Sequence, residues 1–241
     1  EDLYLPYKPK RRTKAQIARE AGLEPLALGL LEDPGQDPEA LAAGYLNPDQ
    51  GVTDIKAALD GARQILMERF AEDAELLGEL RAYLWDNGVI QARLMEGKER
   101  EGAKFSDYFD YREEIAKIPS HRALALFRGR NEGVLSLELE LAQGGEGPSP
   151  CEAMVASRFG VSDQGRPADR WLRDCVRWAW KVKILTHLEL ELKGRLRDGV
   201  TLTQANAVFG SSLASQSGAM SPKATSGDHQ KGVKRLVQTP S

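Results

Sequence analysis

The segment from Ala168 to Arg197 constrains the fold more than any other part of this sequence. Apolar side chains recur there at spacings of mostly three and four residues: Trp171, Cys175, Trp178, Val182, Leu185, Leu188, Leu192 and Leu196. This periodicity predicts one helix of about 45 Å with an apolar face along its whole length. A face of that length must be covered by neighbours, so we expect the helix to be the spine of a bundle.

The residues before this segment predict a series of shorter helices. Thr13 is a typical N-cap residue, and Asp37 followed by Pro38 has the pattern of a second helix start. Apolar residues at helical spacing then predict two stronger helices, which end near Ala71 and Asp86. The expected helices cover residues 13–21, 24–32, 37–46, 53–71, 73–86 and 150–159, and another begins at Ser120.

Two segments have the pattern of β-strands. Residues 89–95 form one candidate. In residues 134–141 apolar side chains alternate with Ser136, Glu138 and Glu140, which is typical of a half-buried strand. The predicted fold is therefore mainly α: a multi-helix bundle with one long central helix and a small two-stranded β element.

Changes in composition divide the chain into three regions. Residues 1–142 hold the shorter helices and the strands, and a loop rich in glycine and proline then begins at Gln143. The second region, residues 143–198, consists of this loop and the long helix. From Gly199 onward Ser, Gln, Gly, Thr and Ala dominate and no apolar face continues, so we expect residues 199–241 to form a disordered tail.

Charge and cysteine content narrow the class of protein. The net charge is only −3 although 29% of the residues are charged, so any nucleic-acid contact must depend on local basic clusters. Cys151 and Cys175 lie far apart, which indicates two reduced thiols. No run of about 18 apolar residues is present, and we expect a cytoplasmic protein without membrane contact. Glu1 is not a start methionine, so we expect a fragment or a processed product.

The densest basic cluster consists of Lys8, Lys10, Arg11, Arg12 and Lys14. It lies before and at the start of the first predicted helix, where the helix dipole disfavours positive charge. Helix stability therefore does not explain these side chains, whereas a phosphate backbone suits both the cations and the helix N-terminus. The alternative is a solvated arm that pairs with nearby acids, and it stays open.

A second basic cluster consists of Arg122, Arg128 and Arg130. Arg128 and Arg130 lie where a predicted helix ends, so a favourable interaction with the helix dipole is a sufficient structural explanation. Guanidinium groups also make bidentate contacts with phosphate. Both interpretations stay open at this point.

The sequence shows no pattern for catalysis or cofactor binding. His121, His187 and His229 are not at ligand spacing from one another or from a cysteine, and no phosphate-binding loop is present. We therefore expect no catalytic residues, no metal and no cofactor. The aromatic side chains are expected to lie in the core: Phe105, Tyr108, Phe109, Tyr111, Trp171, Trp178 and Trp180.

Four segments resemble the Tex family of bacterial transcription accessory proteins: EDLYLPYKPKRRTKAQIAREAGLEPLA, ILMERFAEDAELLGELRAYLW, EGAKFSDYFDY and IPSHRALALFRGRNEGVLSLELEL. The resemblance covers residues 1–198. Proteins of that family have several domains, bind nucleic acid and support transcription. The resemblance implies that this chain is their helical core. It also implies that most of the N-terminal part and the YqgF, helix-hairpin-helix and OB-fold RNA-binding domains are missing.

The resemblance and the basic clusters together predict a non-catalytic scaffold in transcription that binds RNA or DNA weakly through phosphate groups. The expected contacts are Lys8, Lys10, Arg11, Arg12, Arg122, Arg128 and Arg130. The alternative is a module that docks on proteins of the transcription machinery without touching nucleic acid. Its surface would be the exposed face of the long helix together with strand 134–141.

Overall fold

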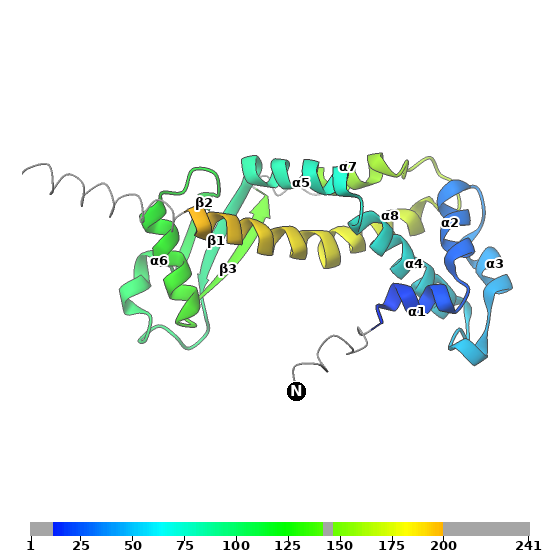
Figure 1. Cartoon of the computed structure of the whole chain (residues 1–241), viewed down its shortest axis with the longest axis horizontal. Helices are drawn as coiled ribbons and strands as arrows, with labels where there is room; N and C mark the ends of the chain where they lie inside the picture. The colour runs from blue at the N-terminus through cyan, green and yellow to red at the C-terminus, as the bar shows by residue number, and fades with distance from the viewer. Residues whose placement is uncertain (1–11, 142–146, 200–241) are drawn as a thin grey trace, which may run out of the picture. The chain divides into compact units, whose positions relative to one another are not determined.

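The computed structural model describes residues 12–141 and 147–199 of the chain. These residues form helices and one small antiparallel sheet, which lies beside α6 near one end of the long helix, and this confirms the predicted mainly α fold class (Figure 1). No helix among them is both long enough and apolar enough to cross a membrane. One cluster of buried apolar side chains runs from Ala15 to Leu196, so the two predicted regions before Gly199 share a core.

Helices α1 and α3 begin directly after the predicted capping residues Thr13 and Asp37. Helix α1 covers Lys14–Glu20, and the Thr13 hydroxyl accepts the Gln16 N–H at 3.0 Å. Helix α2 covers Glu24–Glu32. Helix α3 begins at Pro38 behind the cap Asp37 but ends at Ala42, earlier than predicted, and the short 3-10 turns η2 (Ala43–Tyr45) and η3 (Pro48–Gln50) follow.

Helices α4 (Ile55–Ala71) and α5 (Ala74–Asn87) match the two stronger helical patterns. The cap of α4 is Asp54, whose carboxylate accepts the Ala57 N–H at 2.7 Å, and not the neighbouring Thr53. Helix α4 contacts all three preceding helices and the first part of the long helix, so it connects the N-terminal helices to the spine.

The sheet has the strand order β2-β1-β3, and all neighbours are antiparallel. The two predicted strands are β1 (Gly88–Leu94) and β3 (Leu135–Leu141). The third strand, β2 (Asp110–Glu114), corrects the prediction of a two-stranded element. Its sequence DYREE lacks an apolar alternation, and it is a strand because its backbone pairs with β1 behind the 3-10 helix η4 (Ala103–Tyr108).

Helix α6 (Ser120–Asn131) packs against strand β3. Gly129 makes this close approach possible, because a Cβ at that position would lie 2.5 Å from Leu135 Cδ1. The sheet face that carries Arg93 and Arg112 is mostly polar or charged, and both arginines lie 3.8 Å from Glu140. The predicted half-buried pattern of strand 134–141 is thereby confirmed.

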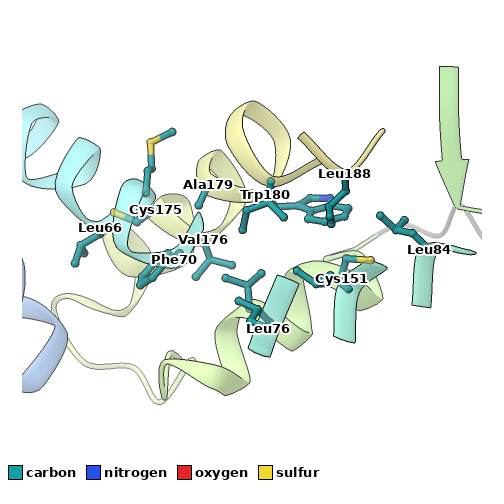
Figure 2. Packing of buried hydrophobic residues seen from close by; sticks show 14 of the residues in the cluster. Leu66, Phe70, Leu76, Leu84, Cys151, Cys175, Val176, Ala179, Trp180 and Leu188 are labelled. Carbon is teal, nitrogen blue, oxygen red and sulfur yellow. The ribbon is translucent and has the colours of Figure 1, made fainter. Parts of the chain in front are cut away.

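The long helix forms as predicted, with an irregularity that the sequence pattern did not show. It consists of α8 (Asp169–Trp178), the π-helical turn η5 (Ala179–Ile184) and residues 185–199. A π-helical turn holds an extra residue, so it rotates the helix face that follows it. Val182 is therefore half exposed instead of buried, and Ala179 and Trp180 lie in the core (Figure 2). Trp178, directly before the turn, is also about half exposed, which corrects its predicted place in the core.

The second half of the long helix closes the free edge of strand β3. The Leu139 N–H donates to Glu189 at 2.9 Å, and the ammonium group of Lys193 donates to the Leu137 carbonyl. The same ammonium donates to Glu189 at 2.7 Å, although Lys193 itself is buried. Unpaired strand edges expose backbone groups, and here two side chains satisfy them.

Both cysteines are free thiols in the core, in agreement with the prediction of reduced thiols. They come from different helices, Cys151 from α7 (Pro150–Arg158) and Cys175 from α8 (Figure 2). Burial raises the pKa of Cys151 to about 12 and raises that of Cys175 as well. Thiolate formation is therefore suppressed at both positions.

Candidate functional site

Most of the predicted N-terminal basic cluster cannot be placed, because Lys8, Lys10 and Arg11 lie outside the described residues. Arg12 is described, and one of its guanidinium nitrogens lies 2.6 Å from a Glu20 carboxylate oxygen. Both side chains of this pair are well exposed, so the pair is weak and leaves Arg12 available to a ligand.

Arg122 is occupied by a contact within the protein. Its guanidinium lies 3.1 Å from Glu113 on strand β2, and the Tyr111 hydroxyl donates to the same carboxylate. Hydrogen bonding to Tyr111 and Glu113 raises the pKa of Arg122 above its usual value. This network joins α6 to the sheet, so the structure gives Arg122 a positioning role that the sequence did not reveal.

At the end of α6 two basic side chains pair with one acid, and a third basic residue lies exposed on the same turn of the chain. Lys104 of η4 lies 2.6 Å from one Glu132 carboxylate oxygen, and Arg128 lies 3.8 Å from the other. Arg130 is exposed, and its guanidinium has no hydrogen bond or ion pair among the described residues. We call Lys104, Arg128 and Arg130 the α6 basic end. Among the described residues Glu132 is the acid that pairs with members of the α6 basic end, so this surface holds more cations than paired acids.

Lys104 is the member of this surface that sequence reasoning missed. It lies far from Arg128 in the chain, and only the packing of η4 against α6 brings the two side chains to Glu132. Its position next to an aromatic group was visible in the sequence, and its ammonium lies 5.1 Å from the centroid of the buried Phe105 ring. The expectation that Phe105 belongs to the core is confirmed.

The two predicted basic clusters do not form one continuous surface in the described part of the chain. Helix α1, behind Arg12, packs on α4, which contacts the first part of the long helix. Helix α6 packs on β3, beside the residues that Glu189 and Lys193 contact (Figure 1). A helix of about 45 Å separates these places. A ligand that touches both clusters would have to follow the long helix.

The described residues contain no group of three or more His, Cys, Asp or Glu side chains that could hold a metal ion. His121 lies exposed on α6, and His187 lies exposed on the long helix about 3.9 Å from Glu191. His229 lies outside the described residues. The α6 basic end is a surface of cations, and such a surface is suited to binding anions by charge.

Comparison with known proteins defines the family. Residues 33–209 match the family model described as Tex central region-like. The chain belongs to the Tex central-region family. The Tex-family match extends beyond Gly199, where the sequence resemblance was expected to end.

The curated relatives include proteins of the same family from several bacteria. The chain is 57% identical over 201 residues to "Protein YhgF" of Escherichia coli (strain K12), covering 82% of this chain and 26% of the relative. It is 56% identical over 217 residues to "Transcriptional accessory protein Tex" of Neisseria gonorrhoeae, covering 88% and 28%. The human "S1 RNA-binding domain-containing protein 1" is 33% identical over 152 residues, covering 60% and 15%. The chain thus spans about a quarter of the length of these bacterial relatives.

Proposed function

We propose that this Tex-family chain is a non-catalytic scaffold of a cytoplasmic transcription accessory protein and that it contacts RNA or DNA weakly through the α6 basic end. The observation that carries the proposal is that Lys104 and Arg128, from segments distant in the chain, meet at Glu132, while Arg130 lies exposed and unpaired on the same helix end among the described residues. Two relatives also support a role in transcription with nucleic-acid contact, because one is named as a transcriptional accessory protein and the other as an RNA-binding-domain protein.

The exposure of these cations suits non-specific contact with phosphate groups. Arg128 and Lys104 are 76% and 59% exposed, and Arg128 is held only loosely by Glu132. Exposed cations of this kind bind phosphate by charge and release counterions, without reading bases. Three such contacts predict that affinity for duplex DNA falls about 40-fold between about 50 and about 200 mM salt.

Fluorescence anisotropy with labelled single-stranded RNA and with duplex DNA tests the proposal. The unmodified chain should bind both at low salt, with little dependence on sequence, and the double variant Arg128→Ala/Arg130→Ala should bind at least about tenfold more weakly. The matched control is Lys56→Ala/Arg69→Ala, which removes two exposed charges from α4. Equal losses in both double variants would show that only bulk charge matters and would refute the site.

A second function is favoured by a different observation. Trp178 and Val182 are 49% and 50% exposed on the long helix, and Trp178 and Ile17 of α1 line one groove of about 440 Å³. Exposed apolar side chains that lie together are typical of protein interfaces. Strand β3 contributes less than predicted, because its edge is already covered by Glu189 and Lys193.

The two functions differ in what they require of the α6 basic end. A module that docks only on proteins would show no salt-sensitive binding to either nucleic acid. It would also lose its partner when Trp178 and Val182 are replaced by serine, whereas the variant Arg128→Ala/Arg130→Ala would retain it. Nucleic-acid binding that survives the serine substitutions and fails in the arginine double variant would exclude this alternative.

A further inference from the structure

A second groove lies between α7 and α8, away from the α6 basic end. It has a volume of about 820 Å³, and its apolar lining consists of Ala153, Ala156, Val161 and Val176. Charged side chains from α7, α8 and the connecting loop complete the lining. Grooves between helices that combine apolar lining with a few polar groups are typical binding sites.

Two of the three arginines that line this groove are paired within the protein. Arg173 lies 2.7 Å from Asp163, and Arg177 lies 3.6 Å from Asp174 one turn earlier in the same helix. Arg170 is exposed, and its guanidinium has no hydrogen bond or ion pair in the described ranges 12–141 and 147–199. The groove is therefore lined by equal numbers of arginines and acids, but only two of the arginines are paired within the described residues.

Glu152 is the unusual member of the lining. It is only 8% exposed, yet its carboxylate has no hydrogen bond or ion pair among the residues that the structure describes. Ser149 and Glu152 have the spacing of a capping box, and the Ser149 hydroxyl accepts the Glu152 N–H at 3.1 Å. The reciprocal hydrogen bond, which the Ser149 N–H would donate to the Glu152 carboxylate, is absent between these two described residues, so the carboxylate can accept from a ligand in the groove.

Glu152 lines the groove without a partner for its carboxylate among the described residues, so a cation that enters the groove can pair with it. We propose that this groove binds a lysine or arginine side chain of a partner polypeptide, with its charged end at Glu152 and its methylene stem on the alanine and valine lining. Long basic side chains bury such stems on apolar surface. The free Arg170 would then accept a carboxylate from the same partner.

The charge pattern favours a polypeptide over nucleic acid as the occupant. A phosphate group could contact Arg170, but the unpaired Glu152 carboxylate would repel it, and the other two arginines of the groove are already paired with aspartates. A polypeptide can offer a cation and an anion at different positions, as Glu152 and Arg170 require. The groove shares no residue with the α6 basic end, so a test of the groove does not depend on whether the chain binds nucleic acid.

The test is an NMR titration of the ¹⁵N-labelled chain with a capped lysine, Nα-acetyl-lysine methylamide. The capped norleucine analogue, which has the same kind of stem without the ammonium, is the ligand control. The lysine probe should shift the amide signals of residues 149–157 and 170–177, and its affinity should exceed that of norleucine roughly tenfold, as a charged hydrogen bond to a buried group provides.

Glu152→Gln should remove this preference, while Glu79→Gln, which changes an exposed carboxylate on α5, should leave it intact. Thermal unfolding of both variants shows whether each remains folded. If Glu152→Gln unfolds the chain, Arg170→Ala gives a second test with a capped aspartate–lysine dipeptide, whose affinity should fall several-fold. Equal binding of lysine and norleucine, no shifts in the groove, or an unchanged preference in Glu152→Gln would overturn the proposal.

Discussion

The contact of Lys193 with the edge of β3 gives the sharpest prediction about stability. Lys193→Met keeps the length of the side chain but removes the ammonium, so the Leu137 carbonyl and the Glu189 carboxylate lose a partner in a largely buried place. Breaking a buried pair on one side costs about 3–5 kcal/mol, which is a large part of the stability of an ordinary domain. We therefore expect the free energy of unfolding to fall by about 3 kcal/mol.

A double-mutant cycle with Glu189→Gln isolates the pair. The double variant should be about 1–2 kcal/mol more stable than the sum of the single losses predicts, because removing both charges leaves no unpaired ion. The matched control is Lys98 with Glu101, which has the same 2.7 Å separation but is well exposed, and its coupling should stay below about 0.5 kcal/mol. Urea unfolding followed by circular dichroism measures all the variants. Similar couplings for the two pairs would refute the claim that burial of Lys193 stabilises the sheet edge.

Three further predictions concern packing, acid stability and thiol reactivity. Gly129→Ala should lower the free energy of unfolding by about 1–3 kcal/mol, because the new Cβ would overlap the Leu135 side chain. Gly78→Ala is the control in α5, where the space is open, and it should raise the free energy of unfolding by about 0.5–1 kcal/mol. Urea unfolding measures both variants. The Arg166 side chain lowers the pKa of Asp169 to about 2. Asp169 therefore stabilises the folded chain above its unfolded-state pKa of about 4, and this contribution is lost as the pH falls toward 2. In Asp169→Asn the free energy of unfolding should depend less on pH across that range, which unfolding measurements at several pH values would show. Cys151 should react with a thiol reagent at pH 8 only after denaturation, and rapid labelling of the folded chain would contradict its burial.

The fold class followed from the sequence because its signals are local. Capping residues such as Thr13 and Asp37 satisfy backbone groups within one turn, so their side chains mark helix starts directly. Strand β3 was visible because one of its faces is buried and the other is polar. Strand β2 was missed because its pairing with β1, and not its own composition, makes it a strand.

The errors along the long helix have a different cause. The apolar spacing assumed a regular helix, and the π-helical turn after Trp178 shifts the buried face so that Val182 becomes exposed. The candidate site shows the same limit. Arg128 and Arg130 were predicted from the sequence, but the role of Lys104 depends on a contact between segments that are distant in the chain.

The central claim is that the α6 basic end contacts phosphate, and the salt dependence of nucleic-acid binding measures this most directly. The slope of log affinity against log salt should be about −2 to −3 for the unmodified chain with duplex DNA. It should become shallower by about two in Arg128→Ala/Arg130→Ala and stay unchanged in Lys56→Ala/Arg69→Ala. An unchanged slope in the arginine double variant would contradict the claim.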